Sequence, residues 1–169
     1  YFQVPAGKAE RMTTSYFLFG GTLLPIDLAR DSIYFDKPPF PFGGAGLAST
    51  PRDYDRFLEM LLGHGEFVGR RVLSEAAVRL GTSDLLPETL TGQDEIGTRW
   101  GFGALGRVGR GEEEGVYGWA GAAGTIGFVD YRSGLRAGLY TQYMPQMAYP
   151  LLEEFPAAIF ADLAAQGSA

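Results

Sequence analysis

Glycine is concentrated in one segment of the chain, and this segment constrains the fold more than any other feature. Ten of the 25 glycines lie between Gly101 and Gly127, interleaved with aromatic residues, Val and Ile. An interior glycine lowers the stability of a strand by ~0.5–1 kcal/mol relative to alanine, so strands this rich in glycine need a reason. Two reasons stay open: close packing of a helix on the sheet, or a substrate along the strand that uses a free backbone N–H as an oxyanion donor.

The residues around these glycines predict three strands of an antiparallel sheet. The predicted strands cover residues 100–108, 116–131 (with a break near Gly121) and 134–142. Gly- and Asp-containing loops at residues 110–115 and 130–134 have the composition of hairpin turns. The segment therefore predicts a meander of consecutive strands.

Two helices are predicted before this sheet and one after it. Thr50 and Pro51 have the residue types of an N-cap and a first helical position. An apolar stripe with a period of 3.6 residues follows, and Gly63 is expected to end the helix as its C′ residue. The stripe consists of Tyr54, Phe57, Leu58, Leu61 and Leu62. Ser74 is expected to cap a second helix that ends near Leu80. The apolar residues 151–163 predict a C-terminal helix over a sheet face, which Pro156 kinks or splits.

The remaining segments predict short elements and loops. Residues 5–12 favour a weak helix, residues 16–19 and 32–35 favour short strands, and residues 82–99 favour a surface excursion. Three prolines within residues 38–41 predict a stiff loop. This loop carries Phe40 and Phe42, either as one wall of an apolar pocket or as plugs of the core. Together the elements predict an α+β fold, with an antiparallel sheet flanked by helices.

Composition excludes several classes of protein. The net charge of −6 argues against a nucleic-acid partner, which needs a basic patch. The lack of cysteine excludes a disulfide framework, a thiolate metal site and a Cys nucleophile. It fits both the cytoplasm, which we favour, and the periplasm. No apolar run reaches the ~20 residues of a membrane span, so no membrane partner is expected. A length of 169 residues suits one domain.

His64 is the single histidine, so a metal site or a Ser-His-Asp triad would depend on this residue. It lies between Gly63 and Gly65, and we interpret it as a solvated loop residue. We likewise interpret Glu112, Glu113 and Glu114 as a solvated hairpin tip. No metal and no cofactor are therefore expected.

The run Trp119-Ala120-Gly121-Ala122-Ala123-Gly124-Thr125 resembles the third active-site motif of the serine β-lactamase-like hydrolases. That superfamily includes class C β-lactamases, DD-peptidases and family VIII carboxylesterases. Its esterase branch often has Trp-Gly-Gly followed by Ala-Ala-Gly-Thr, where the β-lactamases have Lys-Thr-Gly. Gly43-Gly44-Ala45-Gly46-Leu47-Ala48-Ser49-Thr50, Leu73-Ser74 and Gly101-Phe102-Gly103 also resemble segments of this branch, in the same order.

The resemblance implies a β-lactamase/transpeptidase-like fold and acyl transfer through a nucleophilic Ser. It assigns the N–H of Ala122 as an oxyanion donor, with Trp119, Ala120 and Gly121 as substrate-binding residues. The loop residues Phe40 and Phe42 would form the far rim of the pocket. In the family, the nucleophile lies in a Ser-x-x-Lys motif and is assisted by a Tyr of a Tyr-x-Asn or Tyr-x-Ser motif.

This chain departs from the family pattern because its nucleophile motif is missing. Neither Lys8 nor Lys37 follows a Ser by three positions. We interpret Tyr131-Arg132-Ser133, in a hairpin turn after the third motif, as a coincidental match to Tyr-x-Ser. Tyr1 is also not an initiating Met. We therefore expect residues 1–169 to be the C-terminal portion of an incomplete domain, with the nucleophile on a missing N-terminal segment or a second chain.

Charge favours a neutral ester as the small-molecule substrate. Trp119 stands where the β-lactamases have Lys, and no Lys or Arg follows Arg136. A substrate carboxylate would lose a charge-assisted hydrogen bond, worth ~1.5–3 kcal/mol. The favoured function is that of a carboxylesterase, and this chain alone is expected to be inactive. The alternatives are a β-lactamase or DD-peptidase, and a non-catalytic binding module or inert fragment.

Overall fold

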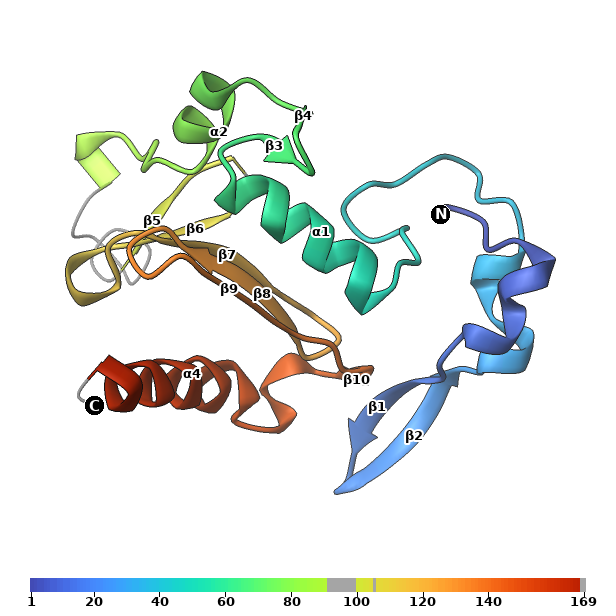
Figure 1. Ribbon diagram of the computed structural model, residues 1–169. Coiled ribbons are helices and arrows are strands. Elements are labelled where there is room, and N and C mark those ends of the chain that lie inside the picture. The colour runs from blue at the N-terminus through green and yellow to red at the C-terminus, as the bar shows by residue number, and fades with distance from the viewer. Residues whose placement is uncertain (91–99, 105, 168–169) are drawn as a thin grey trace. The chain divides into compact units, whose positions relative to one another are not determined.

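A computed structural model describes residues 1–90, 100–104 and 106–167 of the chain (Figure 1). The chain divides into two compact units. Unit 1 comprises Tyr1–Thr50, Ala120–Thr125 and Leu139–Ala169, and unit 2 comprises Pro51–Trp119 and Ile126–Gly138. Within the described residues, no helix has the length and apolar character needed to cross a membrane.

Most residues of a five-stranded sheet belong to unit 2, and every strand of this sheet lies beside its neighbour in sequence. Its strands are β5 (Trp100–Phe102), β6 (Arg107–Gly109), β7 (Val116–Gly121), β8 (Thr125–Asp130) and β9 (Leu135–Leu139), in that order. Connections of this length join only antiparallel strands, so the predicted meander is confirmed. The boundaries differ, because the segment predicted as one strand over 100–108 turns back on itself as β5 and β6. The predicted break near Gly121 is a tight turn between β7 and β8.

Local side-chain hydrogen bonds form the turn between β8 and β9. The carboxylate of the buried Asp130 accepts a hydrogen bond from the Arg132 N–H at 3.0 Å and one from the Ser133 hydroxyl at 2.7 Å. Gly134 closes the turn with a φ of +69°. The loop between β6 and β7 contains a short 3-10 helix, Gly111–Glu113. Both predicted hairpin loops are therefore present.

Two helices and the sheet enclose the core of unit 2, and α1 lies along one face of the sheet (Figure 1). Helix α1 spans Pro51–Leu62, and α2 spans Glu75–Gly81. The Ser74 hydroxyl accepts a hydrogen bond from the Ala77 N–H at 3.1 Å, as predicted for an N-cap. The core residues are Leu58, Met60, Leu61, Val78 and Val129.

The predicted apolar stripe of α1 is wrong at one position. Phe57 is 46% exposed, whereas Met60, which lies outside the stripe, is buried. The core that α1 enters contains Val78 of α2 as well as Val129 of β8. Two partners therefore define the buried surface of α1, and a single stripe describes it incompletely.

The glycines of the sheet region are explained by close approach within the chain. At nine of the ten positions between Gly101 and Gly127, a Cβ atom would come within 3.0 Å of another part of the chain, and Gly111 is the exception. At Gly127 the neighbour is the ring of Tyr54 on α1, so helix-to-sheet packing is confirmed there. At Gly118 the neighbours are Gly127 and Phe128 on the adjacent strand β8. Most of these glycines therefore need no substrate to account for them.

Of the predicted surface excursion over residues 82–99, the part from residue 91 lies outside the described residues. In the part before it, Asp84 is bonded to the sheet. Its carboxylate accepts hydrogen bonds from the Phe102 N–H at 3.2 Å and from Nε of Arg110 at 2.8 Å. Desolvation opposes ionisation of Asp84, but the hydrogen bonds from Arg110, Leu86 and Phe102 outweigh it and lower the pKa of the carboxyl group.

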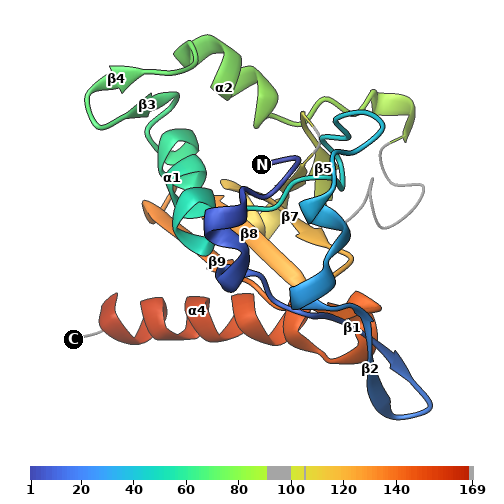
Figure 2. The ribbon, with the colours of Figure 1, turned by 90° about the vertical axis from the view of Figure 1, so that its right-hand side faces the viewer.

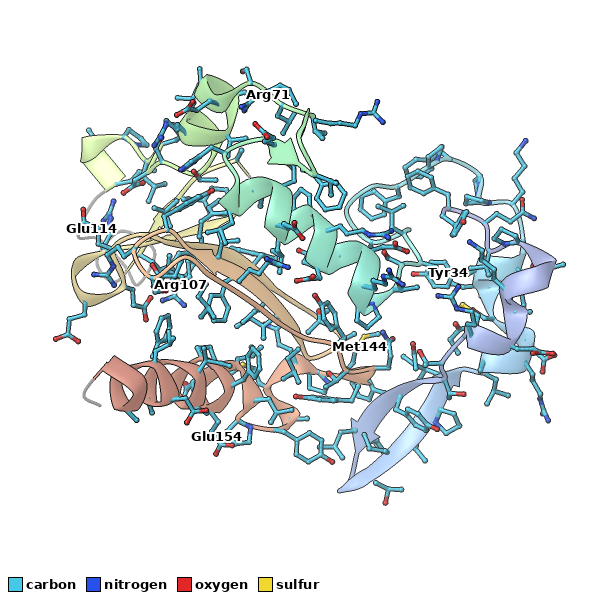
Figure 3. The ribbon with its side chains drawn as sticks, viewed as in Figure 1. Tyr34, Arg71, Arg107, Glu114, Met144 and Glu154 are labelled. Atoms are coloured by element: carbon cyan, nitrogen blue, oxygen red, sulfur yellow. The ribbon has the colours of Figure 1, made fainter. Side chains whose placement is uncertain are left out.

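Unit 1 contains a three-stranded sheet. Strands β1 (Ser15–Phe19) and β2 (Thr22–Asp27) form a hairpin, and β10 (Tyr143–Met144) pairs in parallel with β1 (Figures 1 and 2). Met144 lies opposite Phe17 of β1 (Figure 3). The hairpin turn is Gly20-Gly21, with φ of +56° and +81°, as a type I′ turn requires.

The predictions for the N-terminal segment are confirmed in part. The weak helix over 5–12 is the 3-10 helix Ala6–Arg11, and the strand over 16–19 is β1. The strand predicted over 32–35 is wrong, because Ile33–Phe35 is a 3-10 helix. Ser32 begins it by accepting a hydrogen bond from the Tyr34 N–H at 3.3 Å. Strand β2 was not predicted, although Gly20-Gly21 between two apolar segments is a local signal of a two-residue hairpin turn.

Helix α4 spans Leu151–Gly167 as one element with Pro156 inside it, so the predicted split is wrong. Pro156 lies six residues into the helix. It removes one early hydrogen bond, next to a first turn whose N–H groups have no partners within the helix. The strongly apolar sequence on both sides then continues the helix.

Unit 2 also contains a short antiparallel pair of strands, β3 (Glu66–Phe67) and β4 (Arg70–Arg71).

Candidate active site

The turn between β7 and β8, residues 121–124, carries the predicted oxyanion donor. The Gly124 N–H donates to the Gly121 carbonyl oxygen at 3.1 Å, and Gly124 has a φ of +71°. This is a three-residue hairpin loop, in which a type I turn is followed by a left-handed residue. Ala122 and Ala123 occupy the central positions of the turn. Ala122 is exposed, and its N–H has no acceptor among the residues that the structure describes.

The segment that follows β9 holds this turn from one side. The Thr141 hydroxyl lies 2.8 Å from the Ala123 carbonyl oxygen and 2.7 Å from that of Gly124. The Tyr143 N–H donates to the Ala123 carbonyl oxygen at 3.2 Å. The Ala123 oxygen therefore has two donors, and the turn is tied to a segment about 20 residues further along the chain.

Gly124 is required in this turn for two reasons. Its φ of +71° lies in the left-handed region, which a residue with a Cβ adopts only under strain. A Cβ atom would also come within 3.0 Å of the Thr141 hydroxyl and the Tyr143 ring. Tyr143 is 7% exposed, and its hydroxyl has no hydrogen-bond partner within the described part of the chain. Burial raises the pKa of the Tyr143 phenol.

Trp119, predicted to form a pocket wall, belongs to an aromatic group on β5 and β7. Its ring is edge-on to Trp100 and Phe102, with centroid distances of 6.4 Å and 5.7 Å. Edge-to-face pairs of this kind contribute ~0.5–1.5 kcal/mol beyond the burial of their area. Trp119 is nevertheless 49% exposed. Its ring is thus supported from behind and still presents an apolar surface.

Phe40 and Phe42 lie in a loop without helix or strand, as predicted from its prolines. Their rings contact each other at a centroid distance of 5.9 Å, and they are 64% and 53% exposed. The interpretation of these residues as plugs of the core is therefore wrong. Further along, the Tyr34 hydroxyl donates to the Ala45 carbonyl oxygen at 2.9 Å and anchors the end of the loop (Figure 3). The role of the Phe pair at the rim of a pocket stays a prediction.

Arg136, the last Lys or Arg in the sequence, forms a network of ion pairs. Arg136 on β9 contacts the Asp55 carboxylate at 2.8 Å and the Glu59 carboxylate at 3.2 Å, both on α1. The hydrogen bond that Arg136 donates to the Asp55 carboxylate is the main cause of the raised pKa of Arg136. The side chain therefore stabilises α1 against β9.

His64 is part of the end of helix α1, and its interpretation as a solvated residue is wrong. The Gly65 N–H donates to the Met60 carbonyl oxygen at 2.8 Å, and the His64 N–H donates to that of Leu61 at 2.9 Å. This pattern is a Schellman motif in which His64, with a φ of +50°, is the C′ residue and Gly63 is the C-cap. The half-buried imidazole stacks on Tyr131 at 4.9 Å and 6°.

Tyr131 has a structural role that agrees with its exclusion from the Tyr-x-Ser motif. Its hydroxyl donates to the Leu61 carbonyl oxygen at 3.0 Å, in the last turn of α1. Among the described residues, no group of three or more His, Cys, Asp or Glu side chains is arranged to hold a metal ion.

Sequence reasoning missed Thr141 and Tyr143, which hold the turn, and Trp100 and Phe102, which support Trp119. Gly124 carried a usable signal, because a glycine that ends a three-residue hairpin loop typically adopts a positive φ. Thr141 carried none. A single threonine after a strand has no pattern that indicates which carbonyl groups its hydroxyl will meet.

The fold is similar to that of solved enzymes that are much longer than this chain. Simvastatin synthase (LovD) from Aspergillus terreus matches 85% of this chain with a TM-score of 0.68 and 22% identity. EstCE1, described as a hydrolase with promiscuous acyltransferase activity, matches 85% with a TM-score of 0.66 and 20% identity. The chain spans 41% of the length of each of these solved structures.

Sequence comparison finds a similar relative in Mycobacterium tuberculosis, Protein Rv1367c. It is 40% identical over 87 residues, which are 52% of this chain and 21% of that protein. A second M. tuberculosis protein, described as uncharacterized protein MT1414, matches to the same extent. The chain thus spans about a fifth of the length of these curated relatives.

The family model described as Beta-lactamase matches residues 1–157, which is nearly the whole chain. The match extends over both units, from the N-terminal hairpin through the β7–β8 turn and into helix α4. The solved structures agree with it at the level of the fold, which is β-lactamase/transpeptidase-like with sheets and helices. The chain therefore belongs to the beta-lactamase family, within the β-lactamase-like hydrolase superfamily.

Proposed function

We propose that this chain contributes the oxyanion-binding strand of a serine carboxylesterase that cleaves a neutral ester through an acyl-enzyme. The observation that carries the proposal is the N–H of Ala122. It is exposed and without an acceptor in the described residues, on a turn that its own hydrogen bonds hold in one conformation. A backbone donor fixed before the reaction needs no reorganisation when negative charge develops, which is the requirement for an oxyanion hole.

In the proposed reaction, the Ser oxygen adds to the ester carbonyl carbon, and the Ser proton passes to a neighbouring Lys nitrogen or Tyr oxygen. The carbonyl oxygen becomes negative and accepts a hydrogen bond from the Ala122 N–H. Collapse of the tetrahedral intermediate breaks the bond to the alcohol, which leaves with the proton. Water then attacks the acyl-enzyme by the same route and releases the acid. The fold similarity to a hydrolase with promiscuous acyltransferase activity supports acyl transfer as the reaction class.

A neutral substrate agrees with the charges around the strand. Trp119 supplies an exposed apolar surface where the β-lactamases have a Lys, and Arg136 is engaged by Asp55 and Glu59. No Lys or Arg follows Arg136 in the sequence. A substrate carboxylate would therefore lack a cationic partner from this part of the chain.

The proposal places the nucleophile on another segment or chain, because the 169 residues contain no Ser-x-x-Lys. A direct test is to purify the tagged chain from its native host and label the preparation with a fluorophosphonate. We expect labelling of one Ser in a Ser-x-x-Lys motif that accompanies the chain, and loss of ester hydrolysis when that Ser is changed to Ala. A preparation that contains only the 169-residue species, without label or hydrolysis of p-nitrophenyl esters, contradicts the esterase and favours a binding module.

The role of the Ala122 N–H is tested by the substitution Ala122→Pro. Proline is favoured at the first central position of a type I turn, and it replaces the hydrogen of the N–H with its ring Cδ. We expect a loss of about 10²–10³ in kcat for p-nitrophenyl ester hydrolysis by the labelled preparation. Ala122→Ser keeps the N–H and serves as the control, with kcat close to that of the unaltered chain. Equal kcat values for the two variants would remove Ala122 from the oxyanion hole.

A further inference from the structure

The Thr141 hydroxyl occupies an unusual position beneath the β7–β8 turn. Its Oγ1 lies within hydrogen-bond distance of two carbonyl oxygens, those of Ala123 at 2.8 Å and Gly124 at 2.7 Å. Thr141 is half-buried and belongs to the same unit as the turn. Because a hydroxyl has a single proton to donate, the two carbonyl groups share it. This side chain therefore contacts the turn at two consecutive peptide groups.

The peptide planes of the turn connect this contact to the Ala122 N–H. The Ala122 N–H and the Gly121 C=O belong to one planar trans peptide, so they point in opposite directions. The Gly121 oxygen is held inside the turn by the Gly124 N–H, at 3.1 Å, and the Ala122 N–H must then point out of it. The Gly124 N–H in turn shares its peptide plane with the Ala123 C=O, which Thr141 and Tyr143 hold.

We infer that Thr141 is a positioning residue that sets the direction of the Ala122 N–H through these two linked peptide planes. The inference rests on the proposed function, because it gives the Ala122 N–H an oxyanion to bind. Thr141 does not touch the substrate in this scheme. Its hydroxyl acts on the Ala123 carbonyl group, that peptide directs the Gly124 N–H, and the Gly124 N–H fixes the peptide that carries the donor.

The hydroxyl can be removed with little change in shape. Thr141→Val keeps the branched side chain and deletes the donor, whereas Thr141→Ser keeps the donor and deletes a methyl group. Thr22→Val is a matched control, because Thr22 is exposed on the β1–β2 hairpin of the same unit. A change in amide exchange or in kcat is due to the Thr141 hydroxyl if Thr141→Val causes it and both Thr141→Ser and Thr22→Val do not.

The first experiment uses the 169-residue chain and measures hydrogen exchange at single amides by NMR. In Thr141→Val, we expect the Gly124 and Tyr143 amides to exchange about three- to tenfold faster. The lost hydrogen bond holds the Ala123 carbonyl group, which accepts from the Tyr143 N–H and belongs to the same peptide as the Gly124 N–H. In Thr141→Ser and Thr22→Val, the rates should stay close to those of the unaltered chain. Unchanged rates at both amides in Thr141→Val would overturn the inference.

The second experiment measures ester hydrolysis in the fluorophosphonate-labelled preparation. Misdirection of a donor lowers kcat, so Thr141→Val should reduce kcat about tenfold to a hundredfold with little change in KM, and Thr141→Ser should restore it. An active preparation in which Thr141→Val keeps full kcat overturns the inference. If the unaltered preparation has no activity, the proposed function fails, while the exchange rates still decide whether Thr141 holds the turn.

Discussion

The two units of this protein bury apolar side chains to very different extents. Among the described residues of unit 2, six apolar residues are buried, and five of them form one core between α1, α2 and β8. In the described residues of unit 1, only Val4 and Tyr143 are buried apolar residues. Its β1–β2 hairpin instead exposes Tyr16, Phe17, Phe19, Leu23, Leu24 and Ile26, by 37% to 70%.

This difference indicates that the units are stabilised in different ways. Burial of apolar surface is the main source of stability in unit 2. Unit 1 relies more on hydrogen bonds, such as the pairing of β1 with β2 and β10 and the contacts of Thr141. A hairpin with apolar residues exposed on both faces is marginally stable by itself and is typical of a surface that another polypeptide covers. Under the proposed function, the segment or chain that carries the nucleophile is the candidate for such a partner.

The largest expected effect is in the core of unit 2. Leu58→Ala removes a side chain that is 2% exposed and leaves a cavity among four core neighbours. We expect it to lower the free energy of unfolding by about 2–5 kcal/mol. Both tryptophans, Trp100 and Trp119, belong to unit 2, so urea unfolding followed by tryptophan fluorescence reports this unit. A loss below about 1 kcal/mol would contradict a core centred on this residue.

The next largest effect concerns a polar contact that ties a loop to the sheet of unit 2. Asp84→Asn weakens the hydrogen bonds from Arg110, Leu86 and Phe102, and should cost about 1–2 kcal/mol at pH 7. The control is Glu66→Gln, an exposed carboxylate of unit 2 whose ion pair with Arg71 should contribute almost nothing. Tryptophan fluorescence in urea measures the change at Asp84, and equal stabilities of the two variants would argue against it.

This contribution should depend on pH with a defined sign. Because the pKa of Asp84 is lowered in the folded chain, its stabilisation is fully present above the ordinary aspartate value of 3.8. It is lost as the pH falls through the lower, folded-state pKa, when the carboxylate takes up a proton. The difference in unfolding free energy between the unaltered chain and Asp84→Asn should therefore shrink in acid. A difference that grows in acid would have the wrong sign.

A smaller effect on the free energy of unfolding is expected at the tip of a hairpin in unit 2, which differs from the tip of the hairpin in unit 1. The β1–β2 tip of unit 1 is Gly20-Gly21, whereas the β3–β4 tip of unit 2 is Val68-Gly69. Val68 has a φ of +49° and is 76% exposed, so it carries backbone strain without compensating burial. Val68→Asn should raise the free energy of unfolding by about 1 kcal/mol, because Asn-Gly suits a type I′ turn. An unchanged or lower midpoint in urea would show that the strain is offset elsewhere.

The smallest effect is expected on the exposed hairpin of unit 1. Phe19 is 70% exposed, so Phe19→Ser should change the stability of the isolated chain by less than about 0.5 kcal/mol. Hydrogen exchange at the amides of β1 and β2 measures this locally. If the proposed partner covers the hairpin, the same substitution should weaken its retention on the tagged chain. A large loss of protection in the isolated chain would mean that Phe19 is packed within unit 1.

Several elements could be predicted from the sequence because their signals are local. Thr50-Pro51 marks the start of α1, Ser74 caps α2, and Asp130–Gly134 forms a hairpin turn through its own side chains. The errors fall where a neighbour decides the outcome. Segment 32–35 has the composition of a strand, yet Ser32 starts a 3-10 helix there and bonds to Asp27 at 2.6 Å. Pro156 was expected to kink or split the C-terminal helix, and the split is absent because the apolar residues on both sides continue the helix.

The candidate site likewise has a part that could be predicted from the sequence and a part that depends on distant residues. The run from Trp119 to Thr125 is visible in the sequence and carries the resemblance to the family, which the match over residues 1–157 confirms. The reason for its glycines is not visible there, because Gly127 is matched to Tyr54 on α1 and Gly124 to Thr141 and Tyr143. Caps, turns and periodicity depend on residues a few positions apart, which the sequence states directly. The direction of the Ala122 N–H depends on a hydroxyl 19 residues away, and only the tertiary structure brings that hydroxyl to the turn.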